Sequence, residues 1–373
     1  MAGALQRFTK RFFIACNILL VIVYLLTCFI PYVNAGKYWP IAILGLGFPL
    51  MLFLLLAFIL IWAIVRSRWA FLPLVALILS WQQISVFFAF AKPARENNSR
   101  QGNVLRILNW NVSSWDEANK HKNGGHSHRK DMLALIQAQN PDILCLQEFF
   151  EFESSNYYEP NIPAVKAMGY PYYYFVPHYF RYNKAYRMGV AIFSKYPIDD
   201  TAVVPYKLNS AADNLIYSDI NVNGRIIRLM TIHLQSVRFN PVDYEGINRI
   251  RNTDDEGLEA SRTILSKIIK AYRWRSSQAD QVREEIDKSP HPVILCGDFN
   301  DVPNSYTYFK IRGDMKDAFL AKGAGIGKTL RILGPTLRID YILADKSLEV
   351  AQFDKFNVPY SDHYPIMADI RLK

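Results

Sequence analysis

Polar side chains able to carry out chemistry recur at the ends of short apolar runs after residue 103. They are carboxylates, asparagines and histidines, whereas the runs beside them are rich in isoleucine, leucine and valine. In chain order, the candidate residues are Asn111, Glu148, His233, Asp298, Asn300, Asp340, Asp362 and His363. Strands that deliver polar side chains to one edge of a sheet build a rigid site. The pattern therefore predicts one site assembled from several strands.

The carboxylates in this set fit the hydrolysis of a phosphate ester. That reaction needs a hard cation on the phosphate oxygens, a positioned water, and a group that stabilises charge or protonates the leaving oxygen. Mg²⁺ takes oxygen ligands and keeps several waters, so that one or two carboxylates suffice. We expect Glu148 and Asp362 to supply these ligands, and Asp298 to hold and deprotonate the attacking water.

The two histidines can complete such a site. His233 and His363 can reach the phosphate, and Asp340 can fix the tautomer of a histidine, the orienting role of the third residue in hydrolytic triads. Each residue taken alone also has a simpler interpretation. The polar residues of 297–300 can cap a turn, Glu148 can be a surface residue after a strand, and a single histidine such as His233 is more often packed in a core.

Short strands are the elements that must position these residues. The runs at 104–110, 143–147, 189–194, 226–233, 293–296, 339–343 and 366–372 are predicted to be strands, and 129–139 and 256–287 to be helices. Many strands with few helices between them predict two packed sheets with helices outside, a layered α/β domain. Cys145 and Cys296 lie in two of these strands and are expected to be core residues, not a disulfide or a metal pair.

Three long apolar stretches precede the strands. Residues 12–33, 39–65 and 69–91 contain no Asp, Glu, Lys or Arg, and each is longer than the about 20 residues that a membrane-spanning helix needs. Gln82 and Gln83 weaken the third stretch. The alternatives are a buried helical hairpin of a soluble protein and, for the first stretch, a signal peptide cleaved near residue 35. We favour three uncleaved spans.

The positive charge of the chain is concentrated in this apolar region. Residues 1–100 carry nine Lys and Arg and one acidic residue, whereas residues 101–373 carry 34 Lys and Arg and 32 Asp and Glu. The basic residues before the first stretch and between the second and third predict that both segments lie in the cytoplasm. Three spans then place the rest of the chain outside it. The near-neutral remainder weakens the case for nucleic-acid binding, which needs clustered cations.

Six motifs occur in the order typical of one superfamily. They are NWN at 109–111, LQE at 146–148, TIHL at 231–234, GDFN at 297–300, RIDYIL at 338–343 and SDHYP at 361–365. Together they resemble the endonuclease/exonuclease/phosphatase superfamily, the deoxyribonuclease I-like group, over residues 104–373. The resemblance implies a four-layered α/β sandwich, with two mixed sheets flanked by helices. It also implies a phosphoesterase that uses Mg²⁺, with Mn²⁺ as the alternative cation.

Carried over by motif, the resemblance assigns the metal site and the water site. Glu148 is the implied principal metal ligand, with Asn111 beside it. Asp362 is implied to be a further ligand or the neighbour of one. Asp298 and Asn300 of GDFN are implied to orient the nucleophilic water and the phosphate.

The same resemblance assigns the histidines. Asp340 is implied to pair with His363. His233 matches the second histidine of the deoxyribonuclease and sphingomyelinase branches, which the abasic-site endonucleases lack. The presence of His233 therefore argues against that last branch.

We expect a membrane anchor with three transmembrane helices at residues 1–91, a linker at 92–103 and a catalytic domain at 104–373. Tethering raises the effective concentration of a bilayer-borne substrate, so the expected substrate is a phosphorylated lipid or lipid-linked phosphate outside the cytoplasm. The alternatives are a nuclease acting on DNA or RNA and a non-catalytic, membrane-tethered binding module. The tight spans favour a multi-pass protein of a bacterial inner membrane, and no protein partner can be inferred.

Two further segments carry unusual side chains. His121, His126 and His128 share a glycine-containing loop that could bind a metal, although a solvated loop is the preferred interpretation. The aromatic run 170–180 predicts either an edge strand or a rim that contacts an apolar substrate or the membrane.

Overall fold

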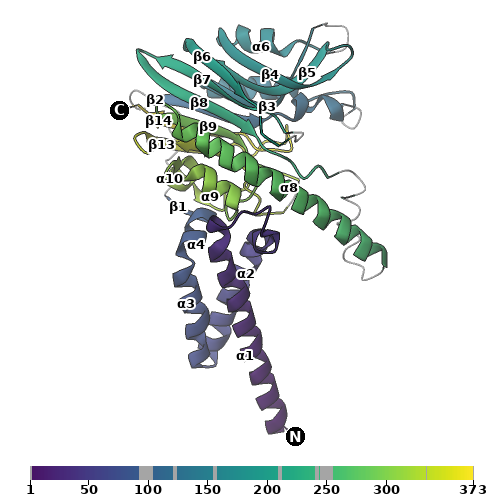
Figure 1. Ribbon diagram of the computed structural model, residues 1–373, viewed down its shortest axis with the longest axis vertical. Helices are drawn as coiled ribbons and strands as arrows, with labels where there is room; N and C mark the ends of the chain where they lie inside the picture. The colour runs from purple at the N-terminus through teal and green to yellow at the C-terminus, as the bar shows by residue number, and fades with distance from the viewer. Residues whose placement is uncertain are drawn as a thin grey trace.

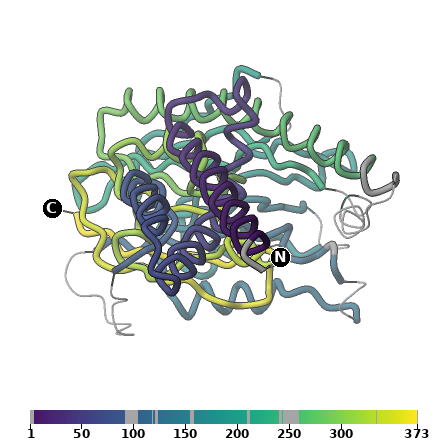
Figure 2. Tube along the Cα trace, turned by 90° about the horizontal axis from the view of Figure 1, so that it is seen from below, coloured from purple at the N-terminus to yellow at the C-terminus, as the bar shows by residue number. Residues whose placement is uncertain are grey.

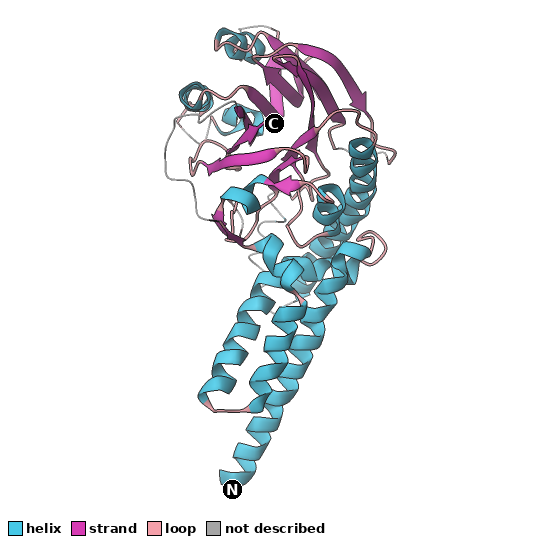
Figure 3. Ribbon diagram, turned by 90° about the vertical axis from the view of Figure 1, so that its left-hand side faces the viewer, coloured by secondary structure: helices cyan, strands magenta, loops and turns pink. Residues whose placement is uncertain are grey.

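The computed structural model describes residues 2–91, 104–120, 124–153, 158–208, 212–239, 243, 255–332 and 334–372. A bundle of helices leaves one end of a domain that contains two β-sheets (Figure 1, Figure 3). The N-terminus lies at the far end of this bundle, whereas the C-terminus lies in the domain. Below, residues 2–91 are called the anchor, and the described residues from 104 onward are called the domain.

The anchor is formed by helices α1 (Ala2–Leu26), α2 (Trp39–Ile64), α3 (Phe71–Leu79) and α4 (Trp81–Phe87), with 3₁₀ turns η1 (Thr27–Tyr32) and η2 (Arg68–Ala70). Two stretches, Ala4–Tyr32 and Trp39–Ile64, are long and apolar enough to cross a membrane. The third predicted span is instead two helical pieces that meet at an angle of 66°. The described residues thus contain two such helices, or three spans if the bent pair counts as one.

The bend in the third stretch lies at Ser80. This residue leaves helical geometry, with φ −96° and ψ 19°. Its hydroxyl donates to the Leu77 carbonyl at 3.2 Å and lies 2.7 Å from the Tyr24 hydroxyl of α1. A serine that bonds back to the preceding turn bends a helix, which explains why this uncharged stretch does not form one straight span.

The domain contains two six-stranded mixed sheets. Their strand orders are β13-β14-β2-β3-β5-β4 and β10-β12-β9-β8-β7-β6. The first sheet comprises β2 (Val104–Asn111), β3 (Ile143–Phe152), β4 (Tyr172–Arg181), β5 (Tyr186–Ser194), β13 (Glu349–Lys355) and β14 (Ile366–Arg371). The second comprises β6 (Ile198–Val204), β7 (Leu215–Val222), β8 (Arg225–His233), β9 (Val293–Asp298), β10 (Lys316–Asp317) and β12 (Asp340–Ala344).

Helices cover the outer face of each sheet (Figure 1). α8 (Asp255–Asp287) packs Val282 and Ile286 against the sheet of β8 and β9. α5 (Arg129–Gln139) packs Met132 and Ile136 against the sheet of β2 and β3. The remaining helices of the domain are η3 (Ser113–Asn119), α6 (Asn161–Ala167), α9 (Tyr306–Arg312) and α10 (Ala318–Lys322). The predicted four-layered α/β sandwich is confirmed.

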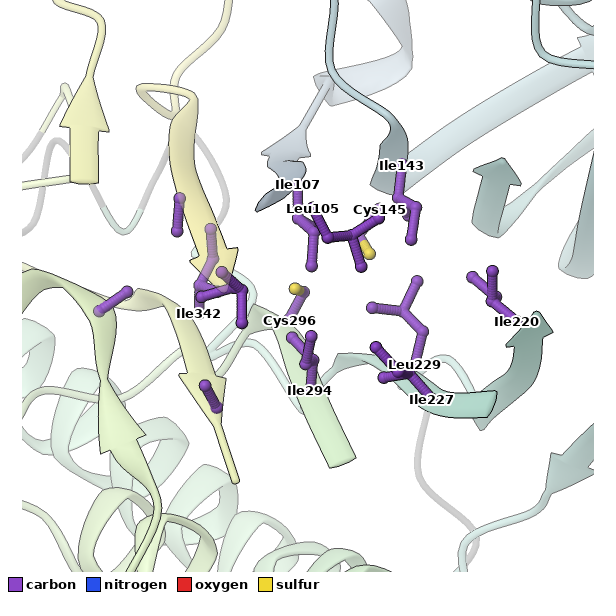
Figure 4. Packing of buried hydrophobic residues seen from close by; sticks show 14 of the residues in the cluster. Leu105, Ile107, Ile143, Cys145, Ile220, Ile227, Leu229, Ile294, Cys296 and Ile342 are labelled. Atoms are coloured by element: carbon purple, nitrogen blue, oxygen red, sulfur yellow. The ribbon is translucent and has the colours of Figure 1, made fainter. Parts of the chain in front are cut away.

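Aliphatic side chains fill the space between the two sheets (Figure 4). The facing residues are Leu105, Ile107, Ile143 and Cys145 of the first sheet and Ile227, Leu229, Ile294 and Cys296 of the second. Because helices also cover the outer faces, both sides of these central strands are buried, and their sequences are almost continuously apolar. Cys145 and Cys296 are buried and free, as expected for core residues.

One parallel pair of strands lies in the middle of each sheet. β2 is parallel to β3, and β8 is parallel to β9. β12 and β14 are antiparallel to their neighbours, with Asp340 opposite Asp298 and Ile366 opposite Asn109. The amino ends of β12 and β14 therefore lie at the same edge as the carboxyl ends of the parallel strands. This topology brings six strand ends together.

The anchor packs directly on the domain. Gly45 of α2 approaches the loop after β9 so closely that a Cβ atom on it would lie 2.0 Å from the carbonyl oxygen of Asn304. The side-chain amide of Asn304 donates to the Gln83 carbonyl at 3.2 Å, and the backbone N–H of Gly36 donates to Ser276 of α8 at 3.1 Å. β1 (Ala89–Phe90) pairs with β11 (Ala324–Gly325). Seen from below, the anchor helices lie across the middle of the domain (Figure 2).

The two unusual segments of the sequence are the aromatic run at 170–180 and the loop with three histidines. The aromatic run forms β4, the last strand of its sheet, so the edge-strand interpretation is confirmed. Its register shifts between Pro177 and Tyr179, where proline cannot donate to a ladder. Of the three histidines, His121 lies outside the described residues, His126 is exposed, and His128 lies 3.0 Å from Asp131 at the start of α5.

Candidate active site

The structure brings all eight predicted site residues to the meeting point of the strand ends. Six of them line one cavity of about 340 Å³, namely Glu148, His233, Asp298, Asn300, Asp362 and His363. The other two are Asn111 and Asp340. Asn111 donates hydrogen bonds to Glu148 and Asp298, and Asp340 is hydrogen-bonded to Nδ1 of His363. The convergence follows from the topology, because seven of the eight lie at or near a strand end at the same edge of the sandwich, and Glu148 lies at the bulge of β3 beside the end of β2.

Asp298 lies at the centre of the group, and its side chain is only 1% exposed. Its Oδ2 atom accepts a hydrogen bond from the Asn111 amide at 3.2 Å. The same oxygen lies 3.7 Å from Nε2 of His233 and 3.7 Å from Nε2 of His363. Burial raises the pKa of Asp298 to about 6; the charge of His363 opposes this rise and that of Asp340 adds to it. Asp298 is thus a carboxylate poised between two imidazoles.

His363 is held by a carboxylate on its far side. Its Nδ1 atom lies 2.9 Å and 3.1 Å from the two carboxylate oxygens of Asp340, and its backbone carbonyl accepts a hydrogen bond from the Trp110 indole at 3.0 Å. Burial alone would lower the pKa of His363, but the charges of Asp340 and Asp298 hold it well above its usual value. His363 lines the cavity, with its Nε2 atom on the side of Asp298.

His233 is held in the same way by a residue that the sequence did not indicate. Its Nδ1 atom lies 2.6 Å from Oδ2 of the buried Asp213, and Asp213 also contacts His178 of β4. The Nε2 atom of His233 lies 3.9 Å from Glu148. Burial would lower the pKa of His233, but the hydrogen bond and charge of Asp213 raise it to about 9.

Two residues of the site have strained backbones. Glu148 and Asn300 have φ of 49° and 51°, in the left-handed region that few residues other than glycine adopt. At Glu148, the register of β3 against β5 shifts between Leu146 and Phe149, and such a bulge re-aims a side chain. Glu148 accepts from the Asn111 amide at 3.2 Å. Strain of this kind clusters at functional sites.

The oxygen atoms that face the cavity fit a hard divalent cation. Glu148, Asp298 and Asp362 all line it. Among the described residues, neither Glu148 nor Asp298 pairs with a lysine or arginine, and their partners are Asn111, the backbone N–H of Asn300 and imidazoles. Carboxylates gathered without a basic partner are the donor set that Mg²⁺ prefers.

A second grouping of ligand atoms overlaps with this one. Asp298, Asp340 and His363 offer ligand atoms within 4.8 Å of one another. Both oxygens of Asp340, however, already face Nδ1 of His363. Glu148 and Asp362 line the cavity but are not part of this grouping.

Asp213 and His178 are the site residues that sequence reasoning missed. Asp213 lies outside the strands, just before β7, and no motif surrounds it. His178 lies in the aromatic run of β4, where it is one polar residue among tyrosines and phenylalanines. Only the contacts of Asp213 with His178 and with His233 show that they support His233.

Replacing Asp213 by asparagine should lower kcat about 10- to 100-fold, the cost of losing a carboxylate that orients a histidine. The variant removes the negative charge that raises the pKa of His233, so that the imidazole loses its proton at a lower pH than in wild type. The alkaline limb of the pH–rate profile should therefore move to lower pH. Asp199→Asn, at an exposed aspartate of β6, serves as the control. A uniform loss of activity with an unmoved profile would show that Asp213 is only structural.

Comparison with known proteins agrees with this geometry. The model of the Endonuclease/Exonuclease/phosphatase family matches residues 103–363, and a model described as a domain of unknown function matches residues 10–87. Sphingomyelinase C of Bacillus cereus is 22% identical over 343 residues, which cover 78% of this chain and 96% of that protein.

Two solved structures share the fold. The human Nocturnin catalytic domain with bound sulfate anion superposes with a TM-score of 0.51 and 20% identity, over 72% of this chain and 94% of that one. An endonuclease/exonuclease/phosphatase from Beutenbergia cavernae DSM 12333 has a TM-score of 0.51 and 19% identity, over 72% of each chain. The family match covers all eight convergent residues and every strand of the two sheets except β14, and the chain belongs to the Endonuclease/Exonuclease/phosphatase family.

Proposed function

We propose that this protein is a membrane-anchored, Mg²⁺-dependent phosphoesterase that hydrolyses a phosphate ester of a lipid or lipid-linked substrate. The observation that carries the proposal is the placement of Asp298. Two imidazoles, each paired with a carboxylate, lie 3.7 Å from one of its oxygens. The cavity in front of it also reaches the anchor, through Leu46 of α2.

In this proposal Asp298 holds the attacking water and accepts its proton. Its pKa is raised towards the working pH, which makes it a better proton acceptor than an exposed aspartate. Asn300 fixes this carboxylate, because its backbone N–H donates to Oδ1 of Asp298 at 2.8 Å. His363, oriented by Asp340, and His233, oriented by Asp213, donate from Nε2 to the phosphate oxygens. One of the two then protonates the leaving oxygen.

The metal belongs to the same proposal. When bound, Mg²⁺ supplies charge neutralisation on the phosphate oxygens. We assign Glu148 and Asp362 to hold it, with Asn111 orienting Glu148 through its 3.2 Å hydrogen bond. Mn²⁺ takes the same oxygen ligands and is the alternative cation.

Chelation gives the first test of the metal. Treating the purified protein with EDTA should lower phosphoesterase activity at least about 100-fold, because the negative phosphate then meets the carboxylates without a neutralising charge. Added Mg²⁺ or Mn²⁺ should restore the activity. The thermal midpoint, measured in parallel, controls for unfolding. Full activity in EDTA would contradict metal dependence.

The lipid preference rests on the anchor and on charge. The domain carries nearly equal numbers of acidic and basic residues after position 100, so it lacks the excess of cations typical of nucleic-acid binding. A curated relative is named a sphingomyelinase C. A panel should offer sphingomyelin, phosphatidylinositol phosphates, polyprenyl diphosphate and plasmid DNA to the full-length protein with Mg²⁺. Faster cleavage of plasmid than of every lipid would favour the nuclease alternative, and turnover of none would favour a binding module.

We also propose the division into an anchor at 1–91, a linker at 92–103 and a catalytic domain at 104–373, with the domain outside the cytoplasm of a bacterial cell. The linker lies outside the described residues. The N-terminal turns of α1 and the segment after α2 lie side by side, since Lys10 and Ser67 line the same pocket. This end of the anchor carries the basic residues and lies opposite the domain (Figure 1). A reporter fused after Lys373 should be active in the periplasm, and cytoplasmic activity would contradict this orientation.

A further inference from the structure

The lining of the cavity at the site is of two chemical kinds. Carboxylates and imidazoles gather around Asp298. Apolar side chains, called the apolar wall below, line the same cavity, namely Leu46, Phe239, Ile268, Leu330, Ile332 and Leu337. A phosphate alone needs no such wall. An apolar surface continuous with a phosphoesterase site is suited to a substrate that joins a phosphate to a hydrocarbon.

Leu46 relates the apolar wall to the level of a bilayer around the anchor. From Leu46 to Ile64, α2 rises about 27 Å at about 1.5 Å per residue. The hydrocarbon core of a bilayer is about 30 Å thick. If the end of α2 near Arg66 lies at one interface, Leu46 therefore lies at the boundary of the other. In that placement, the part of the apolar wall at Leu46 lies where hydrocarbon chains meet the headgroups.

The exposed face of α2 continues from the cavity into the bilayer. Leu46, Leu50 and Phe53 are 40%, 63% and 67% exposed, and their spacing places them on one face of the helix. One turn closer to the domain, Ala42 is buried against Tyr272 of α8. On this face of α2, the side chain at Ala42 is therefore covered by the domain, whereas the side chains of Leu46, Leu50 and Phe53 are exposed. These three exposed residues form an apolar track that ends at the cavity.

The position of the cavity relative to this track is fixed. Besides the contact of Gly45 with Asn304, the guanidinium of Arg338 donates to the Val86 carbonyl of α4 at 2.7 Å. Arg338 lies between Leu337 and Ile339, both of which line the cavity. The junction therefore holds one side of the cavity in register with the anchor, and the site cannot turn away from the membrane without breaking buried contacts.

We propose that the apolar wall binds the hydrocarbon chain of the substrate while its phosphate reaches Asp298. The proposal rests on the phosphoesterase function proposed above and adds to it a specificity-determining subsite. The chain leaves the bilayer along the apolar track, past Phe53 and Leu50 to Leu46, and lies in the cavity during hydrolysis. The enzyme then selects its substrate by the length of the hydrocarbon beside the phosphate.

The test uses a series of alkyl 4-nitrophenyl phosphates with methyl, hexyl and dodecyl chains. Each releases 4-nitrophenolate when water adds to phosphorus and the aryl P–O bond breaks, so the chemistry is the same along the series. The full-length protein with Mg²⁺ is assayed in mixed micelles of one non-ionic detergent. Leu46→Trp fills the track and Ile332→Asn places an amide in the wall. Leu56→Trp on α2 and Val203→Asn on β6 are matched controls, because both residues are exposed and neither lines the cavity.

In wild type, kcat/KM should be at least about tenfold higher for the dodecyl than for the methyl ester, since each buried methylene favours binding by up to a factor of about four. Leu46→Trp and Ile332→Asn should remove most of this preference, because they lower kcat/KM for the dodecyl ester far more than for the methyl ester. A thermal midpoint close to that of wild type shows that both variants are folded. The two controls should keep the wild-type preference.

The outcomes separate this subsite from the function on which it rests. Equal rates for methyl and dodecyl esters in wild type would overturn the subsite and leave the phosphoesterase standing. So would a preference that the two wall variants retain in full. If wild type cleaves none of the esters, the hydrolase function fails, and the subsite fails with it.

Discussion

Asp298→Asn should lower kcat for phosphate-ester hydrolysis by about 10²- to 10⁴-fold, the range for loss of a positioned general base. Asparagine has the same shape and can still accept from the Asn300 backbone N–H, which lies 2.8 Å from Oδ1 in wild type. It cannot take a proton from water. The loss should therefore appear in kcat with little change in thermal midpoint. Steady-state kinetics on the preferred ester of the panel would measure it.

Two comparisons make this result specific. His363→Ala should cause a loss of similar size, and the double variant should be little worse than either single one, because residues that act as a unit are not additive. Asp287→Asn on α8, whose side chain is 63% exposed, should retain wild-type activity. An Asp298→Asn enzyme within a factor of about three of wild type, on this order-of-magnitude scale, would remove Asp298 from the mechanism.

Arg338→Ala should destabilise the protein by about 3–5 kcal/mol, the usual cost of leaving a buried charge without its partner. Arg338 is 1% exposed and donates to Asp317 at 2.6 Å as well as to the Val86 carbonyl at 2.7 Å. Its guanidinium also lies over the rings of Phe319 and Tyr341, at 4.7 Å and 4.8 Å. Urea unfolding of the detergent-solubilised protein would measure the loss.

A second variant shows whether the stability lost in Arg338→Ala comes from the unpaired charge of Asp317 or from lost packing. Arg338→Met combined with Asp317→Asn removes both charges while asparagine can still cap α10, as Asp317 does through the Phe319 N–H at 2.9 Å. It should recover part of the stability. Lys346→Ala, which breaks an exposed pair with Asp314, should cost at most about 1 kcal/mol. If Arg338→Ala costs no more than this control, the buried pair does not hold the junction.

The strands at the centre of the fold could be predicted because a short stretch of sequence is enough to indicate that they are buried. β2, β3, β8 and β9 are covered on both faces, so each is an apolar run that ends in polar residues. The helix at Arg129–Gln139 was predicted with its observed bounds, because Asn140 and Pro141 stop it. The eight candidate residues could be predicted for the same reason, because each lies in a short motif at the end of a predicted strand.

Strands at the periphery could not be predicted in this way. β6 is largely half-buried or exposed, so no continuous apolar run marks it, and β4 was only one of two interpretations of its aromatic run. β7 contains Ser218 and Asp219, and Asp219 is buried only because Arg228 of β8 pairs with it at 2.7 Å. A buried charge is favourable only with its partner, and that partner is supplied by the neighbouring strand.

The amino-acid sequence was enough to predict which residues could do the chemistry and that the chain carries apolar helices long enough for a membrane. Three features became visible only in the folded chain: Asp213 supports His233, the third apolar stretch bends at Ser80, and the cavity reaches Leu46. The physical reason is the range of the interactions. Apolar runs and strand-end motifs depend on residues close in sequence, whereas the convergence of strand ends and the docking of α2 depend on residues far apart along the chain, such as Gly45 and Asn304.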